Sequence, residues 1–257
     1  MAENVIDTTQ TVSSERSQRL CGLIAIETSG RTGSVAWCDG QSTPRLIELD
    51  PATRTTASLA PALAELLAEA RSQQRSVDLI AVACGPGSFT GVRIGVTSAK
   101  LLAYALGCRL VAVDTLAAMA GAVFDRQPHC DSVAVAINAY RQQLFVADWT
   151  REQWIAAAET NSLAVQSRVC VAADWPSLET AERGRVWAAE PAVARKLTPA
   201  AGGQPAVPAG PEILSAWPSA LDVARLGRRL ADAGHFISPM ALRPNYLRDS
   251  AAEEKLR

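Results

Sequence analysis

An unbroken apolar segment that runs into a glycine-rich loop is the feature that most limits how this chain can fold. Residues 79–84 are all apolar and follow Asp78, which is typical of a strand buried on both faces of a sheet. The loop at 85–91 comes next, and mainly apolar residues then predict a helix from about residue 92 to 105. Because a buried strand followed by a helix is the repeating unit of α/β proteins, this segment predicts an α/β fold.

The rest of the first half alternates in the same way. Three short apolar runs separated by turn residues predict an antiparallel meander, and leucines at helical spacing predict an amphipathic helix before the buried strand. The expected elements are strands at 23–26, 34–38, 45–49, 78–84 and 109–113, and helices at 59–70, 92–105 and 115–124.

A second, weaker cycle follows. Apolar runs at 133–137 and 144–149 flank a tight connection, which predicts a hairpin. Further strands are expected at 169–171 and 186–188, and a helix at 220–233. Two cycles of mixed strands and helices predict two lobes. The expected organisation is a disordered N-terminal extension (1–20), a first lobe (21–127), a smaller second lobe (128–250) with a proline-rich loop at 199–218, and a C-terminal tail (251–257).

The composition excludes some classes of protein. Lys plus Arg is 25 and Asp plus Glu is 26, so the chain is not a basic protein that wraps nucleic acid by bulk charge. No apolar run reaches the roughly 18 residues of a membrane helix, and the polar first twenty residues do not resemble a signal peptide. We therefore expect a cytoplasmic protein with no membrane partner.

The glycine-rich loop is the strongest candidate for a binding site. It has the sequence GPGSFTGVRIG and lies between a buried strand and a helix, where free backbone N–H groups favour an anion. It matches neither a Walker A loop nor G-x-G-x-x-G. A tight turn whose glycines serve close packing is an equally good interpretation. The candidate phosphate-loop residues are Gly85, Gly87, Ser88, Thr90, Gly91 and Arg93.

The sequence contains few residues that could form a metal site or a catalytic site. Glu27 ends the first strand beside a glycine-containing turn, which suits a metal–phosphate site, but a solvated strand end is the simpler interpretation. The histidines, His129 and His235, are far apart, so neither an H-E-x-x-H helix nor a Ser-His-Asp triad is expected. We predict no catalytic residue, no metal and no cofactor.

The helix after the glycine loop carries apolar residues on nearly all sides. Such a helix must be covered by the sheet and also by a neighbouring helix or a partner; full burial within the monomer is an open alternative. Gly95, Ala99 and Ala103 recur every four positions, which would let a second helix approach closely. The expected partner interface combines this helix with the leucine helix, through Leu63, Leu67, Gly95, Ala99, Leu102 and Ala103.

Several of these segments resemble the TsaB (YeaZ) family. The string GPGSFTG-x-RIG is highly specific, and three further matches fall in the family's order over roughly residues 21–250. They are the opening IAIETS from Ile24 to Ser29, the turn Ala139-Tyr140-Arg141, and the closing Pro244-x-Tyr246-Leu247-Arg248.

The resemblance implies a fold and a function. The fold would be the two-lobe one of sugar kinases, Hsp70 and actin, with a degenerate nucleotide site. The function would be that of a non-catalytic subunit in the transfer of threonylcarbamoyl to the adenosine next to the anticodon of ANN-decoding tRNAs. The expected partners are the catalytic paralogue TsaD and the ATPase TsaE, with tRNA contacted only through the complex. The sequence leaves undecided whether the chain forms a homodimer when TsaD is absent.

Three departures from the family pattern concern polar groups. Glu27 stands where the family usually has Asp, Asn138 opens the hairpin in place of Asp, and a typical His is absent before the first long helix. They argue against residual nucleotide or metal binding. Two alternative functions remain: an active phosphotransferase that uses Glu27 and the glycine loop, and a homodimeric binding module.

Overall fold

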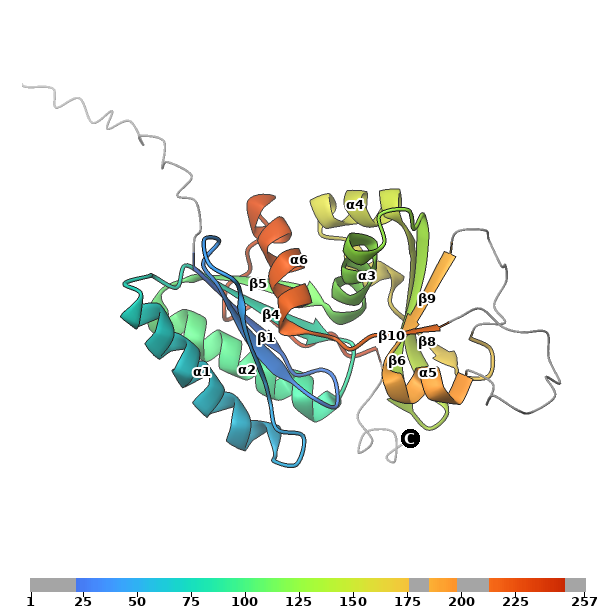
Figure 1. Ribbon diagram of the computed structural model, residues 1–257, viewed down its shortest axis with the longest axis horizontal. Coiled ribbons are helices and arrows are strands. Elements are labelled where there is room, and N and C mark those ends of the chain that lie inside the picture. Colours follow the sequence, from blue (N-terminus) through green and yellow to red (C-terminus); the bar gives the residue numbers. More distant parts are fainter. Residues whose placement is uncertain (1–21, 176–184, 198–212, 248–257) are drawn as a thin grey trace, which may run out of the picture.

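The structure is a computed structural model that describes residues 22–175, 185–197 and 213–247 (Figure 1). The predicted extension at 1–20 and the predicted tail at 251–257 lie outside the described residues. Within those described, no helix is both long and apolar enough to cross a membrane.

The first sheet has five strands in the order β3-β2-β1-β4-β5. Strands β1, β2 and β3 pair antiparallel, as the predicted meander requires, whereas β4 and β5 run parallel to β1. The unbroken apolar segment forms β4, which lies between β1 and β5 and is buried along its whole length. The strands are β1 (Leu23–Glu27), β2 (Ser34–Cys38), β3 (Arg45–Glu48), β4 (Leu79–Gly85) and β5 (Arg109–Asp114).

Helices cover both faces of this sheet. Helices α1 (Thr55–Ser72) and α2 (Phe89–Leu106) lie on one face, where their apolar stripes pack against Ile24 and Ile26. Helix α6 (Ala220–Asp232) lies on the other face, although it comes from the end of the chain (Figure 1). Helix α6 packs so closely on β4 that a Cβ added at Gly227 would lie 2.5 Å from Ala81 Cβ.

The second sheet repeats the connectivity of the first. Its order is β10-β9-β6-β7-β8, so its first strand is again flanked by an antiparallel hairpin partner and a parallel strand. The predicted hairpin joins β6 and β7. The strands are β6 (Ser132–Tyr140), β7 (Gln143–Thr150), β8 (Arg168–Val171), β9 (Arg185–Ala189) and β10 (Ile213–Ser215). The α/β two-lobe fold predicted from the sequence is therefore confirmed.

The last helix of each cycle packs against the other lobe. Helix α3 (Thr115–Arg126) follows β5 but contacts β6 and β7 of the second sheet, while α6 follows β10 and covers the first sheet. The sequence assigned 220–233 to the second lobe by chain order alone. The two crossing helices also contact each other, so they join the lobes through their side chains.

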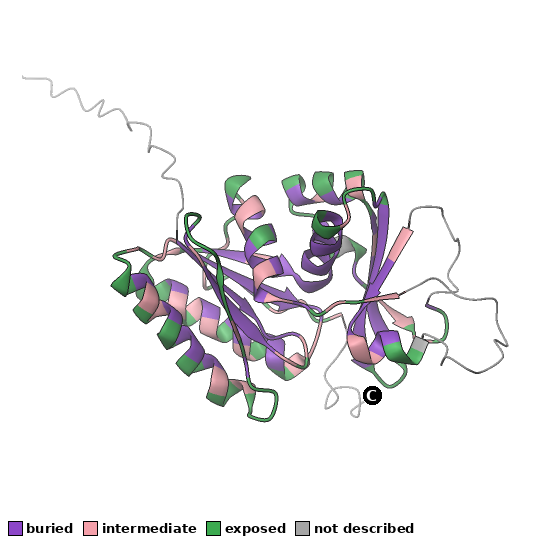
Figure 2. Ribbon diagram, viewed as in Figure 1, coloured by how far each residue is buried: buried purple, intermediate pink, exposed green. Residues whose placement is uncertain are grey.

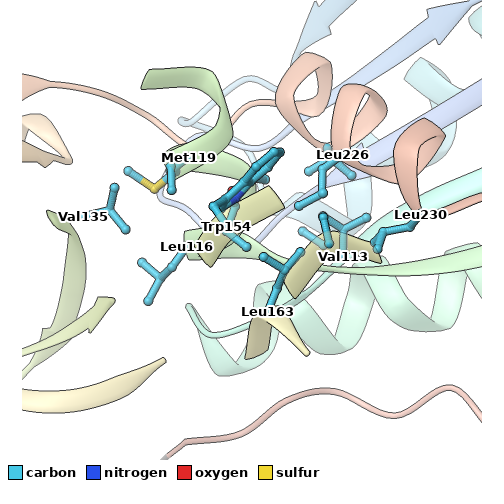
Figure 3. Packing of buried hydrophobic residues seen from close by; sticks show 14 of the residues in the cluster. Val113, Leu116, Met119, Val135, Trp154, Leu163, Leu226 and Leu230 are labelled. Carbon is cyan, nitrogen blue, oxygen red and sulfur yellow. The ribbon is translucent and has the colours of Figure 1, made fainter. Parts of the chain in front are cut away.

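One apolar core runs through this junction (Figure 3). Val113 comes from the first sheet, Val135 from the second, and Leu226 from α6. Trp154 of α4 (Arg151–Thr160) lies among them, with its Nε1 donating to Ala117 O at 3.0 Å. In Figure 2 the inner strands of both sheets are buried, while the outer faces of α1 and α4 are exposed. The core therefore lies between the layers and between the lobes.

The remaining elements correct the sequence prediction in the second lobe. Helices α4, α5 (Pro191–Leu197) and the short 3-10 helix η1 (Leu163–Gln166) were not predicted. Helix α4 buries only Trp154 and Ala158, so it shows little apolar periodicity. The predicted loop at 199–218 contains β10, a three-residue strand that includes no proline. Residues 199–212 of that loop lie outside the described ones.

Candidate functional site

The glycine loop joins the carboxyl end of β4 to the start of α2. Ser88 is the N-cap of α2, and its Oγ accepts from Gly91 N at 3.3 Å. Ser88 N in turn donates to Ser29 O at 2.8 Å. The end of β1 and the start of α2 are therefore bonded directly to each other, and two of the loop's amides are engaged by the chain itself.

The glycines allow this close approach of one backbone to another. A Cβ at Gly91 would lie 2.0 Å from Thr28 O, and one at Gly87 would lie 2.6 Å from Ser29 Cβ. Gly85 has a left-handed φ of 113°, and its Cβ would lie 2.6 Å from Asn245 O. No side chain fits at such distances, so each of these glycines has a packing role.

The C-terminal segment closes over the loop from the other side. Asn245 N donates to Cys84 O at 2.6 Å, and Leu242 is fully buried beside α2. The ring of Tyr246 stacks on that of Phe89, with 4.5 Å between centroids. The closing motif that carried part of the family resemblance is thus a structural partner of the glycine loop.

Asp114 ties this region to the second lobe. Its carboxylate caps α3 by accepting from Ala117 N at 2.9 Å and also accepts from Ser167 Oγ at 3.1 Å. Burial raises the pKa of Asp114 to about 6, against the lowering effect of its hydrogen bonds from Ala117, Ser167 and Asn245. The first lobe, the second lobe and the C-terminal segment therefore meet at one buried carboxylate.

Glu27 is buried at the end of β1. Its Oε1 accepts from Ser29 N at 2.6 Å and from Ser29 Oγ, while Oε2 has no hydrogen-bond partner in the described part of the chain. Burial raises the pKa of Glu27 to about 7, although the bonds from Ser29 lower it. A carboxylate held in this way is neither the solvated strand end of the sequence analysis nor an exposed metal ligand.

The β6–β7 hairpin faces the same region from the second lobe. Asn138 Oδ1 accepts from Tyr140 N at 2.9 Å. Tyr140, Arg141 and Gln142 all have left-handed φ values, of 62°, 50° and 62°, a conformation that costs about 1–2 kcal/mol for each such residue. Asn138 therefore uses its side chain to shape a strained turn.

Glu190 follows β9 and lies close to this turn. Burial raises the pKa of Glu190, while a backbone hydrogen bond from Asn138 and the charges of Lys196 and Arg31 lower it. Because Arg31 belongs to the β1–β2 turn, this interaction reaches from one lobe to the other. Among the described residues, no group of three His, Cys, Asp or Glu side chains is placed to hold a metal ion.

We expect no stabilisation of the protein by ATP or inorganic phosphate. The candidate loop residues do lie together, with Thr90 and Arg93 exposed, but the glycines are packed against the chain's own backbone. Thermal denaturation with and without millimolar ligand checks this, because a ligand at a hundred times its dissociation constant stabilises by about 2.7 kcal/mol. A saturable shift that is lost in Arg93→Ala would establish an anion site instead.

The predicted interface residues divide between the core and the surface. Gly95, Ala99 and Ala103 face the first sheet: Ala99 and Ala103 are buried, and a Cβ at Gly95 would lie 2.2 Å from Thr28 Oγ1. This corrects the prediction that these small residues admit a second helix, because they let α2 approach the first sheet closely. Leu63 is also buried, while Leu67 and Leu102 are half-buried between the helices and solvent.

The sequence analysis missed the exposed apolar residues of α2. Leu101 is 66% exposed and Tyr104 is 80% exposed, one turn apart on the face away from the sheet. The outward position of Leu101 follows from helical geometry once the small residues are placed against the first sheet, since a residue two positions after Ala99 is rotated by about 200° around the helix. Because α2 is apolar on nearly all sides, its sequence alone does not indicate which side contacts the sheet and which side is exposed.

Two lobes with the same strand connectivity, joined by two crossing helices, define a two-lobe α/β protein. A sequence profile of the family described as TsaD, tRNA N6-adenosine threonylcarbamoyltransferase, matches residues 52–198. The chain belongs to this family and, within it, to the TsaB (YeaZ) group, as the following relatives indicate.

The protein TsaB of Haemophilus influenzae, named for tRNA threonylcarbamoyladenosine biosynthesis, is 34% identical over 131 residues, which are 51% of this chain and 55% of that protein. TsaB of Escherichia coli is 33% identical over 132 residues, 51% of this chain and 56% of that protein. The matched segment thus spans little more than half the length of these relatives. A solved structure from Pseudomonas aeruginosa, described as similar to peptidase YEAZ, superposes with a TM-score of 0.67 at 25% identity, covering 88% of this chain and 99% of that one.

Proposed function

We propose that this chain acts in the biosynthesis of threonylcarbamoyladenosine in tRNA, as a non-catalytic subunit that binds and activates the catalytic paralogue TsaD. The names of the TsaB relatives support the pathway. The observation that carries the subunit role is the exposed apolar face of α2. In this proposal TsaE joins the complex of the two paralogues, and tRNA is contacted only through that complex.

The α2 face has the character of a protein-binding surface. Leu101 and Tyr104 project from it, at 66% and 80% exposure. Helix α1 lies beside α2 on the same face of the sheet and presents a row of small exposed residues, Ala57, Ala60, Ala64 and Ala68. Large apolar side chains next to a row of small ones suit close helix-to-helix packing with a partner. A paralogue with the same fold offers a matching pair of helices.

The state of Glu27 supports a subunit without transfer chemistry over an active phosphotransferase. Phosphotransfer needs carboxylates placed to hold Mg²⁺ and to accept a proton from the acceptor. Here Glu27 is buried and bonded to Ser29, and Asn138 shapes the hairpin turn.

The test is the double variant Leu101→Glu with Tyr104→Glu, mixed with the TsaD paralogue from the same cell. Two charges at the centre of an apolar interface would be left unpaired on binding, so we expect affinity for TsaD to fall at least about a hundredfold. Calorimetry would measure binding, and modification of an ANN-decoding tRNA by the reconstituted complex would measure activation. Both should be lost together while the variant stays folded.

A matched control is Met240→Glu, at an apolar residue that is 78% exposed on the C-terminal segment. This variant should bind and activate TsaD as the parent does. If the α2 double variant binds as well as the control, the interface lies elsewhere. If the chain modifies tRNA on its own, without TsaD, the non-catalytic role is wrong.

A further inference from the structure

A groove lies on the second lobe, far from the α2 face. It has a volume of about 800 Å³ and runs along the outer side of α4, beside the start of β6. In Figure 1, α4 lies at the top of the second lobe, whereas α1 and α2 lie at the lower left, on the first lobe. A partner in this groove would therefore leave the α2 face open.

Arg151, which lines the groove, directs its guanidinium away from it. The guanidinium of Arg151 donates to Gln127 O at 2.8 Å and to Phe124 O at 3.1 Å, and its Nε donates to Cys130 O at 3.2 Å. It also lies over the ring of Phe124, 4.8 Å from the centroid. Arg151 thus caps the end of α3, where cations are favoured, and its charge is directed to those carbonyls and not to the groove.

What the groove presents is an apolar strip between carboxylates. Glu152, Ile155 and Glu159 follow one another at i, i+3 and i+7 along α4, so they share one face of the helix. Ile155 is 36% exposed, Ala156 lies beside it, and Asp131 adds a third carboxylate from the start of β6. Two acidic groups about 10 Å apart, with an apolar surface between them, form a specific pattern and not a uniformly polar helix face.

We propose that this α4 groove is the docking site for a basic segment of a partner protein, in which an apolar side chain lies between two Lys or Arg residues. The apolar residue would cover Ile155 and Ala156, and the cations would meet Glu152 and Glu159. Charge complementarity favours this occupant. The same charges repel the phosphates of RNA, so the groove is not a tRNA contact. The inference does not depend on the proposed TsaD-binding role.

The probe is a synthetic helical peptide with Lys, Leu and Lys at positions i, i+3 and i+7, and its control carries Glu in place of both lysines. Full-length protein labelled with ¹⁵N should show amide shifts along α4 with the Lys peptide only. Glu159→Lys is the sharpest variant, because a cation in the last turn suits the helix dipole and α4 should stay folded. We expect affinity to fall at least about fivefold in about 0.05 M salt, and the difference to shrink in about 0.5 M salt.

Glu48→Lys is the matched control, since Glu48 is an exposed residue of β3 in the first lobe. It should bind the Lys peptide within about twofold of the parent, as expected for a surface charge outside the contact. Ile155→Ser should weaken binding at both salt concentrations, because it removes apolar contact. The proposal is overturned if the Lys peptide does not bind, if Glu159→Lys and Glu48→Lys bind it equally, or if the amide shifts lie away from α4.

Discussion

Gly91→Ala is expected to lower the free energy of unfolding by about 3 kcal/mol or more, a loss at the upper end of overpacking effects. The new Cβ would lie 2.0 Å from Thr28 O, a backbone atom of the buried residue that follows β1. That oxygen cannot move aside as a flexible side chain would, so α2 must shift away from the sheet. For a chain of this size the melting temperature should fall by roughly 6 to 12 °C.

The sign of this effect is informative. Gly91 lies inside α2, where alanine would stabilise an unobstructed helix by up to about 1 kcal/mol. Gly30→Ala is a suitable control, because its Cβ would meet its nearest atoms at 3.7 Å, an ordinary contact. Denaturant unfolding of both variants measures the difference. A stable Gly91→Ala protein would mean that the glycine serves something other than the close approach of α2 to β1.

Glu27→Gln is expected to remove a large part of the pH dependence of stability. The pKa of Glu27 is raised from 4.5 to about 7 in the folded protein, so the folded state holds its proton more tightly than the unfolded state does. Stability from this group is complete below about pH 4.5 and is lost as the pH rises through 7. Between pH 5 and pH 8 the parent should therefore lose about 2 to 3 kcal/mol that the Gln variant keeps.

The comparison isolates Glu27 because other groups are common to both proteins. Asp114, whose pKa is raised from 3.8 to about 6, contributes in the same direction but cancels in the difference. An uncharged amide at Glu27 changes stability by an amount that does not vary with pH. Urea unfolding at pH 5, 6.5 and 8 gives the two slopes. Parallel curves for parent and variant would show that Glu27 is already ionised at pH 5 in the folded protein.

Much of the first lobe could be predicted from the sequence, because its patterns are strong. The unbroken apolar run gave β4, the turn-separated runs gave the β1–β2–β3 meander, and leucine spacing gave α1. Helix α4 could not be predicted in this way. It buries Trp154 and Ala158 on an otherwise polar helix, and a single large side chain that fills a core shared by two lobes leaves no periodic signal.

The contacts made by the glycine loop could not be predicted from sequence patterns. The glycines of the loop were recognised, and close packing was one of the two interpretations, but the groups that they pack against are distant in sequence. Asn245 reaches Gly85 from the C-terminal segment, and Ser167 reaches Asp114 from the second lobe. Contacts between residues this far apart depend on topology, which a single sequence specifies only through the whole fold.

The crossing of α3 and α6 affects how the protein is made on the ribosome. The strands of the first sheet are complete once β5 has been synthesised, but one face of that sheet is covered mainly by α6, about a hundred residues further along the chain, and in smaller part by α3, which contacts β4 and β5. Until then, Leu23, Ala25 and Ala81 have no permanent cover on that face. The first lobe therefore cannot finish folding as an independent N-terminal unit during translation, and the nascent chain carries an open apolar sheet that a chaperone can recognise.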